Sequence, residues 1–350
     1  MTYQSPVQAS DFHPVTQAYF AGACVAVTGG SGFVGSHVVE QLLALGAKVI
    51  VPSRQAAPPF LAHLGTRIDL RLCDFQDRPQ TSSTIDGADV VMNLAASVAG
   101  IEYNAAHPET IFRDNIRTFL NVMEAALQIK ARRFLVVSSA CIYPRHCLVP
   151  TPETEGFADT PEPTNAGYGW AKRMEEYAAA AAAKEHGLEV AIVRPYNAFG
   201  PRDNFNPESS HVLPALILKA DETTDGTLPV WGDGTPTRSF LYVDDFARGL
   251  IEVTARYAAA DPVNIGASEE VSIGTVADMV ADIIGRRRRT TITPTFMPTS
   301  LTGQPRRDCD TTKLESALGF RPNVGLREGL ERSISWFLDN RELALTAHRQ

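Results

Sequence analysis

The amino-acid sequence predicts a doubly wound parallel α/β sheet, followed by a smaller C-terminal domain. Short apolar runs of strand length alternate with segments of helical periodicity in the first half of the chain. A glycine-rich turn stands between the first apolar run and the first helical segment. After residue 195 the alternation gives way to a stretch rich in Gly, Pro, Asn and Asp. These three observations separate a sheet domain from a second, less regular one.

The predicted elements follow one another in the order that a parallel sheet requires. Strands are expected over residues 24–28, 48–51, 68–72, 90–94, 134–138 and 190–193. Helices are expected over residues 36–45, 110–130, 166–185, 244–255, 273–284 and 326–338, with one more short strand at 262–265. Because each crossover returns the chain to the same edge of the sheet, the strands are parallel and both faces are covered.

The domain boundaries follow from these elements. Residues 1–21 show no clear periodicity and are interpreted as a loose N-terminal extension. The other boundaries are 22–195 for the sheet domain with a returning segment near 239–265, 196–238 and 266–340 for the second domain, and 341–350 for a tail. The irregular stretch runs to about residue 234. Such stretches inside compact proteins are usually functional, which predicts a substrate-binding role for the second domain.

Composition limits the classes of partner. The chain has 350 residues and a formal net charge of -8, which argues against nucleic acid as the partner. No apolar stretch reaches the about 18 residues of a membrane span, and the N-terminus lacks a signal segment. Five scattered cysteines form neither a Cys-x-x-Cys pair nor a zinc-binding set, so no metal site is expected. These features predict a soluble cytoplasmic protein.

The glycine-rich turn predicts a dinucleotide site of the Rossmann type. Gly29, Gly32 and Gly35 form G-x-x-G-x-x-G directly between a strand and a helix, and Phe33 and Val34 open the helix. Glycine lets the backbone approach a pyrophosphate, and the helix N-terminus offers free N–H groups to the phosphates. A glycine-rich turn without a ligand is the alternative.

The end of the second strand favours NADP(H), with NAD(H) as the alternative. An NAD site normally places an acid there for the ribose 2′-OH, but this chain has Ser53 and Arg54. A guanidinium can bind a 2′-phosphate bidentately. Asp74, after the third strand, is expected either to accept from the adenine amine or to cap a turn. Ala95, after the fourth strand, is a small residue expected against the cofactor.

Four residues predict proton chemistry beside that cofactor. Tyr168 and Lys172 lie one helical turn apart, which places an ammonium beside the phenol and predicts a lowered tyrosine pKa. This is an acid/base pair suited to hydride transfer. Ser139 can hydrogen-bond the same substrate oxygen, and Cys141 adds a thiol that acts as a base when a cation is close. A small buried hydrophobe is the alternative for Cys141.

In this order the motifs resemble the extended short-chain dehydrogenase/reductases, in the nucleotide-sugar epimerase/dehydratase group, from about residue 22 to 340. Within this group the chain looks most like the GDP-L-fucose synthases, and next most like the GDP-mannose 3,5-epimerases. The motifs that carry this resemblance are Ser139-Ala-Cys141-Ile-Tyr-Pro, Asn197-Ala-Phe-Gly-Pro-Arg-Asp-Asn-Phe-Asn-Pro, Ser-Ser-His211-Val-Leu-Pro and Trp231-Gly-Asp-Gly-Thr-Pro-Thr-Arg238. The chain departs from the fucose synthases in two features. Its glycine turn has the general form of the larger group, and Lys219 stands where the fucose synthases tend to carry Arg.

The resemblance implies a function and a set of residue roles. Cys141 and His211 would be the base and acid of a 3,5-epimerisation, and Tyr168 with Lys172 would serve a 4-reduction and contact the cofactor. The implied substrate is a GDP-4-keto-6-deoxy-hexose, reduced with NADPH by a homodimer. The implied substrate contacts are Asn197, Lys219, Trp231, Arg238 and Arg306. A surface salt bridge is the alternative for each of the two arginines.

Three other functions remain open from the sequence. One is an epimerase that uses the cofactor transiently, without net redox change. Another is a reductase or epimerase of a different nucleotide sugar, such as a GDP-heptose. The third is a cofactor-sensing module without turnover, which is expected to lack Tyr168, Lys172 or Cys141, whereas all three are present.

Overall fold

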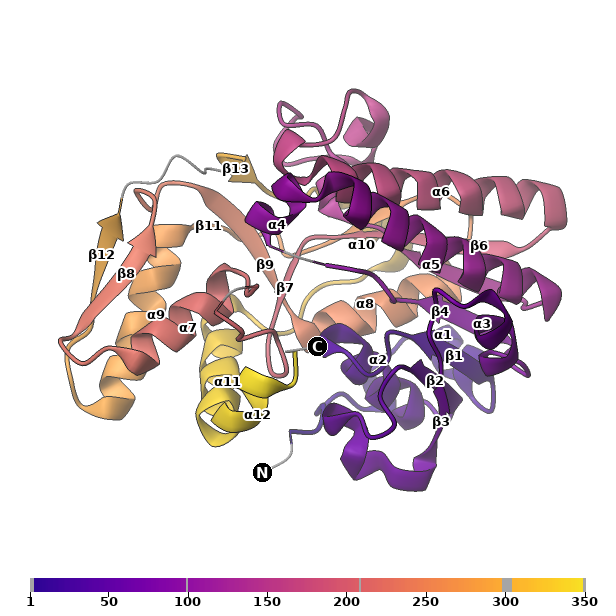
Figure 1. Ribbon diagram of the computed structural model, residues 1–350, viewed down its shortest axis with the longest axis horizontal. Helices are drawn as coiled ribbons and strands as arrows, with labels where there is room; N and C mark the ends of the chain where they lie inside the picture. The colour runs from indigo at the N-terminus through magenta and orange to yellow at the C-terminus, as the bar shows by residue number, and fades with distance from the viewer. Residues whose placement is uncertain (1–2, 99, 208, 298–303, 349–350) are drawn as a thin grey trace.

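Residues 24–195 and one returning strand at 263–265 build a seven-stranded parallel sheet (Figure 1). The computed structural model describes residues 3–98, 100–207, 209–297 and 304–348. Along the sheet the strands lie in the order β3-β2-β1-β4-β5-β6-β10, and every pairing is parallel. The strands are β1 (Cys24–Thr28), β2 (Lys48–Ser53), β3 (Ile68–Leu72), β4 (Val90–Asn93), β5 (Arg133–Val137), β6 (Glu189–Pro195) and β10 (Val263–Ile265). The strand order reverses between β1 and β4, where ligands of such sheets bind.

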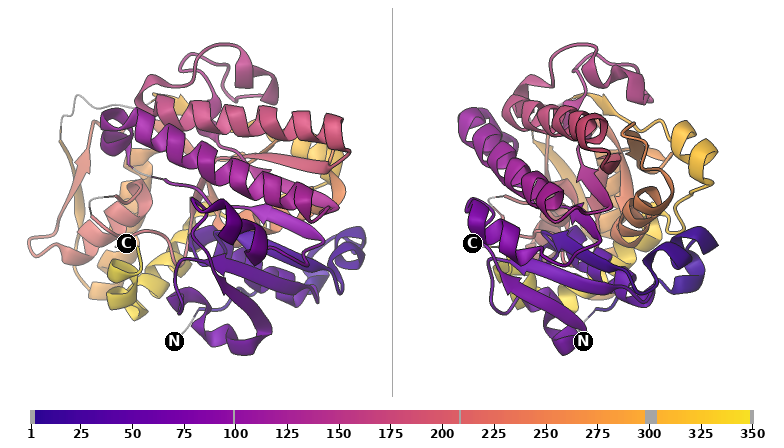
Figure 2. Two further views of the ribbon diagram at one scale, coloured as in Figure 1. Left: turned by 45° about the vertical axis from the view of Figure 1, so that its right-hand side comes forward. Right: turned by 90° about the vertical axis from the view of Figure 1, so that its right-hand side faces the viewer.

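Helices cover both faces of this sheet, as the fold prediction requires. Val25 and Val27 of β1 belong to a core shared with α2 (Phe33–Ala44) and α8 (Val243–Arg256). Ala26 faces the opposite core, which α5 (Pro108–Gln128) and α6 (Ala166–His186) share. Alternate residues of a strand point to opposite faces, so one apolar run supplies both cores. Figures 1 and 2 show α5 and α6 side by side along one face.

The N-terminal segment is ordered against α8 and not loose. It forms η1 (Ala9–Asp11) and α1 (Pro14–Phe20), with Phe20 fully buried. Ser5 Oγ donates a 2.8 Å hydrogen bond to Asp244, and Thr16 Oγ1 donates a 2.6 Å bond to Glu252. Both carboxylates come from α8, and they hold a segment too short for sequence periodicity to reveal.

The second part of the chain has its own sheets and core. β9 pairs with β7, β11 and β13, and β8 pairs in parallel with β12. The strands are β7 (Asn197–Phe199), β8 (Thr227–Trp231), β9 (Thr237–Tyr242), β11 (Glu270–Ser272), β12 (Thr293–Met297) and β13 (Arg306–Arg307). The helices are α7 (Val212–Glu222), α9 (Ile273–Arg288), α10 (Thr312–Leu318), α11 (Leu326–Asp339) and α12 (Arg341–Thr346). A separate apolar core unites α7, α9, α11 and α12.

The stretch from 195 to about 234 is less irregular than its composition predicts. It contains α7, whose Leu213, Leu216 and Ile217 are buried at helical spacing. Pro214 lies in the first turn of α7, where a missing N–H costs little, so it does not break the helix. The Gly-, Pro- and Asn-rich part is the loop between β7 and α7.

The remaining elements are short. They are η2 (Pro59–Arg67), α3 (Arg78–Thr84), α4 (Ile101–Ala106), η3 (Ala140–Ile142), η4 (Glu153–Phe157) and η5 (Pro163–Asn165). Every strand and helix predicted from the sequence is present, with ends shifted by a few residues. Within the described residues, no helix combines the length and apolar character needed to cross a membrane.

Candidate active site

The glycine turn after β1 lies flush against the end of β4. Gly29 has a positive φ of 68°, and a Cβ there would stand 2.9 Å from the backbone of Leu94 and Ala95. A Cβ on Gly35 would meet the carbonyl oxygen of Gly29 at 2.1 Å. Side chains at these two positions would therefore collide with the backbone of the turn and of the end of β4.

The helix that follows this turn presents open backbone donors. Gly32 is the N-cap of α2 and provides no side-chain cap, so the first N–H groups of the helix stay free for an anion. Phe33 and Val34 form the first turn of α2. This cradle fits a dinucleotide pyrophosphate on its own geometry.

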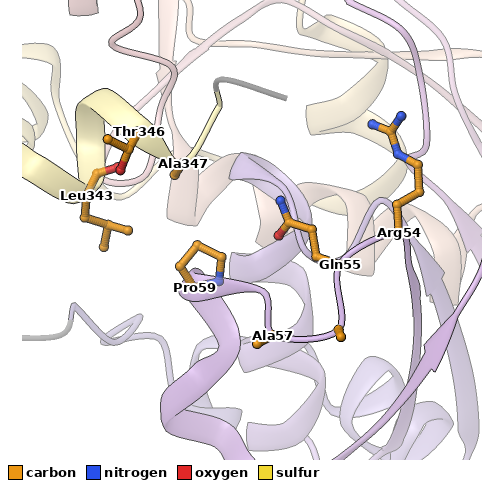
Figure 3. A pocket seen from close by; sticks show the side chains of 8 residues that line it. Arg54, Gln55, Ala57, Pro59, Leu343, Thr346 and Ala347 are labelled. Carbon is orange, nitrogen blue, oxygen red and sulfur yellow. The ribbon is translucent and has the colours of Figure 1, made fainter.

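A pocket of about 440 Å³ lies beside the end of β2 (Figure 3). Ser53 is buried, and its Oγ donates a 3.1 Å hydrogen bond to Ser31, whereas Arg54 is exposed at the pocket. Figure 3 shows Gln55 and Pro59 facing α12 across this pocket. Its lining residues are Arg54, Gln55, Ala56, Ala57, Pro59, Leu343, Thr346 and Ala347. No carboxylate is among them.

Two further residues predicted at the cofactor have structural partners. Asp74 Oδ1 accepts a 3.0 Å hydrogen bond from the Gln76 N–H, which is the turn-capping alternative. Ala95 donates its N–H to Thr28 Oγ1 at 3.2 Å, which ties the end of β4 to the glycine turn.

Ser139, Cys141 and Tyr168 come together beyond the end of β5. The N–H of Cys141 donates a 3.1 Å hydrogen bond to Ser139 Oγ at the start of η3. Ser139 also hydrogen-bonds Tyr168, and Tyr168 lies close enough to Cys141 for the two to interact electrostatically. All three side chains are half-buried, so they remain accessible to a ligand.

Lys172 does not lower the pKa of Tyr168, in contrast to the prediction. Burial raises that pKa, Cys141 and Glu175 raise it further, and the hydrogen bond from Ser139 opposes them. Lys172 Nζ lies 5.6 Å from the Tyr168 ring centroid but donates to Glu175 at 2.8 Å and to the Val137 carbonyl at 3.0 Å. The carboxylate of Glu175 thus offsets the ammonium of Lys172. Burial raises the pKa of Glu175 to about 7.

Two glycines allow the first turn of α6 to approach this site. A Cβ on Gly169 would stand 2.6 Å from the carbonyl oxygen of Cys141. A Cβ on Gly167 would stand 2.2 Å from the carbonyl oxygen of Pro108. The residues that flank Tyr168 are therefore packed backbone to backbone, which fixes where the phenol lies.

The second part of the chain brings Arg307, and not Arg306, to the sulfur. Arg307 Nη2 lies 3.6 Å from Cys141 Sγ. Arg306 is exposed and pairs with Glu270, with 2.6 Å between Nη2 and Oε2. Neighbouring strand residues point to opposite faces, so only one of the two arginines can reach Cys141. The sequence analysis missed Arg307, because its position is set by the pairing of β13 with the distant strand β9.

The other predicted substrate residues lie on neighbouring elements of the second part. Arg238 on β9 is in register with Arg307 on β13. Burial, followed by the charge of Arg307, lowers the pKa of Arg238 to about 10. Lys219 on α7 stacks over Trp231 at 4.7 Å from the ring centroid. Asn197 Nδ2 donates a 2.9 Å bond to the Ser239 carbonyl.

His211 lies at the N-cap of α7. Its side chain is open to solvent on one side, but the surrounding protein partly desolvates the imidazole and lowers its pKa. A lowered pKa makes the imidazolium a stronger acid and reduces its share at neutral pH. That His211 and Cys141 flank one sugar ring stays a prediction.

Comparison with known proteins shows the family to which the chain belongs. The NAD dependent epimerase/dehydratase family matches residues 25–266. The chain belongs to this family. GDP-L-fucose synthase 1 from Arabidopsis thaliana is 34% identical over 321 residues, which cover 91% of this chain and 94% of the relative. The dTDP-4-dehydro-6-deoxy-D-allose reductase of Streptomyces bikiniensis is 32% identical over 92% of this chain and 98% of the relative.

A solved structure confirms the fold of this epimerase/dehydratase family member. UDP-glucose 4-epimerase from Thermotoga maritima superposes with a TM-score of 0.80 at 26% identity, covering 91% of this chain and 99% of that chain. Within the described residues, no three His, Cys, Asp or Glu side chains gather where they could hold a metal ion. The five cysteines are free thiols.

Proposed function

We propose that this enzyme is a nucleotide-sugar 3,5-epimerase and 4-reductase that acts on a GDP-4-keto-6-deoxy-hexose with NADPH. The observation that carries the proposal is the thiol of Cys141 beside Ser139 and Tyr168 in one accessible site. A reductase alone needs only the Tyr168 side of this arrangement. The relative named GDP-L-fucose synthase 1 covers nearly the whole chain, which supports the same reading.

Epimerisation uses the acidity that a 4-ketone gives to its neighbours. The C–H bonds at C3 and C5 can ionise because the electron pair delocalises into the ketone oxygen as an enolate. Ser139 and Tyr168 donate hydrogen bonds to that oxygen and stabilise the developing charge. Cys141 removes a proton from one face of the ring, and His211 returns one to the other face. The configuration inverts at both carbons.

Reduction then uses Tyr168 as the acid. NADPH, when bound, supplies the hydride for C4. Because burial raises the pKa of Tyr168, the phenol keeps its proton at neutral pH and gives it to the alkoxide at O4. Gly29, Gly32 and Gly35 would hold the pyrophosphate, and Arg54 the 2′-phosphate that distinguishes NADPH from NADH.

The substrate would be held by the second part of the chain. Arg238 stays charged at neutral pH and suits a diphosphate. Trp231 is 64% exposed and offers an aromatic face, with Lys219 on the other side of the ring. Asn197 would complete the sugar contacts. Holding the ring at several points keeps it in place while two carbons invert.

A second candidate is a reductase or epimerase of another nucleotide sugar. The Streptomyces bikiniensis relative, named for a dTDP-linked keto-sugar, matches the chain almost as well as the fucose synthase does. Lys219 in place of the usual Arg also departs from the fucose synthases. An epimerase without net redox change would carry the same catalytic groups.

The test combines two signals in one reaction. Purified protein, NADPH and GDP-4-keto-6-deoxy-mannose are mixed in heavy water. We expect loss of reduced-nicotinamide absorbance in proportion to substrate, with deuterium at C3 and C5 of the product. Deuterium uptake without loss of absorbance would assign an epimerase instead. Inactivity with this sugar but turnover of a UDP-, CDP- or dTDP-linked keto-sugar would assign the second candidate.

We also propose that the enzyme is a homodimer that pairs through α5 and α6. These helices expose apolar side chains to solvent, with Leu120 at 42% and Tyr177 at 69% exposure. Analytical ultracentrifugation should give twice the mass of the chain, and Tyr177→Asp should shift the equilibrium toward monomer.

A further inference from the structure

The guanidinium of Arg307 lies beside the sulfur of Cys141. Hydrogen bonds from two of its nitrogen atoms fix its orientation. Arg307 Nη2 lies 3.6 Å from Sγ and also donates to the carbonyl of Ala140 at 3.3 Å. Arg307 Nε donates to Gln304 Oε1 at 3.0 Å. Gln304 is buried and donates its own amide to the carbonyl of Pro144 at 2.9 Å. The arginine is therefore tied to the same loop that carries Cys141.

The backbone delivers Arg307 to this place from the other part of the chain. β13 pairs in parallel with β9, which sets Arg307 opposite Arg238 and Arg306 opposite Thr237. Thr151 and Cys309 form a further bridge between the loop after β5 and the chain after β13. The contact between Arg307 and Cys141 thus joins the two parts of the molecule at the reacting group.

Arg307 is also the cation whose charge the site favours. Burial alone would lower its pKa, but the net shift is upward because Cys141 favours the charged guanidinium, with help from Tyr196 and Glu162. Glu162 is buried and already pairs with Arg145 at 3.0 Å. Desolvation lowers the pKa of His211, which disfavours its charged form. Arg307 is the cation that contacts the sulfur.

We propose that Arg307 is a positioning residue for Cys141, which holds the sulfur in place and supplies the charge that favours a thiolate. This proposal depends on the function proposed above in one respect only, which is that the sulfur removes a proton from the sugar. In that step a C–H bond of the sugar breaks and an S–H bond forms. The electron pair moves into the enolate, whose oxygen faces Ser139 and Tyr168. The negative charge leaves the neighbourhood of Arg307, and Arg307 favours its return when the thiol is deprotonated again.

Alkylation of Cys141 tests this without any substrate. The thiolate is the form that reacts with iodoacetamide, so the rate reports the charge state of the sulfur. Rates are measured at neutral pH by mass spectrometry of the peptide that contains Cys141. We expect Arg307→Gln to slow alkylation about tenfold and Arg307→Lys to keep most of the rate. Arg306→Gln, which removes the same charge one residue earlier, should leave it unchanged.

The half-buried Cys147, read in the same digest, reports whether the loop is intact. Wild-type alkylation of Cys141 in Arg307→Gln, with Cys147 also unchanged, would overturn the proposal. If Cys147 changes as well, Arg307→Lys decides: retained Cys141 reactivity supports the role, and a loss as large as in the Gln variant overturns it. Absence of deuterium uptake by the wild type would instead remove the proposed function and leave the alkylation result standing.

Discussion

At the scale of single residues, Tyr168 shows how neighbours decide what a side chain does. The spacing from Lys172 predicts a phenol whose pKa is lowered, but Glu175 takes the ammonium and burial raises the pKa instead. A sequence shows which residues are one helical turn apart, whereas the acid three residues further along becomes a partner only once the helix buries it. The protonated phenol suits an acid better than a base.

Replacement of Tyr168 by Phe should separate the two proposed reactions. Hydride transfer to C4 is expected to fall about a hundredfold or more, because the alkoxide loses its proton donor. Deuterium uptake at C3 and C5 should persist at a reduced rate, since Cys141 and Ser139 are untouched. The same rapid-quench samples give both rates. Equal loss of exchange and reduction would contradict separate roles.

The sign of the pH dependence follows from the same residue. The ordinary pKa of a tyrosine is about 10. Because the pKa of Tyr168 is raised, the phenol stays protonated up to that pH and above it. Reduction limited by this acid should therefore not fall between about pH 6 and about pH 9. Single-turnover reduction of a substrate already epimerised checks this. A decline with a midpoint near neutrality would show that the phenol titrates there and that the burial argument fails.

At the scale of elements, periodicity predicted most helices and strands. An element that buries one face or both faces carries apolar residues at a regular spacing along the sequence. It predicted α6 well, since that helix is long and rich in strong helix formers. It missed α7, because a proline in its first turn is usually a sign against a helix. It also missed α1, which carboxylates of α8 hold in place. The contact of Arg307 with Cys141 depends on pairing between distant strands, which no local pattern contains.

The first turn of α6 depends on Gly169. Gly169→Ala should lower stability by about 1–3 kcal/mol, because its Cβ would stand 2.6 Å from the Cys141 carbonyl oxygen. The displaced turn would also move Tyr168 and lower the rates of both exchange and reduction. Gly274→Ala is the matched control, because its Cβ meets nothing nearer than 3.4 Å in α9. Chemical denaturation of both variants measures the difference, and equal stabilities would contradict this packing.

At the scale of the whole molecule, the two parts meet at both ends of the proposed active site. Arg307 of the second part contacts Cys141 at the reacting end. At the other end, α12 forms one wall of the pocket whose opposite wall follows β2 (Figure 3). Arg341 pairs with Asp221 at 3.0 Å and so ties α12 to α7. Residues 341–348 therefore contribute to the wall of this pocket and are more than a tail.

Thr346 provides a test of that pocket that does not disturb the fold. Its side chain is exposed in the pocket that Arg54 also lines, so a carboxylate there would repel a 2′-phosphate bound in this pocket. Thr346→Glu should raise the dissociation constant for NADPH about tenfold, which corresponds to about 1.4 kcal/mol, and change that for NADH much less. Thr346→Gln has nearly the same size without the charge and should leave both constants near wild type. Quenching of protein fluorescence by each cofactor measures the four values. An equal effect of Glu on NADPH and NADH would place the 2′-phosphate elsewhere, and Arg54 would lose its proposed role in choosing the cofactor.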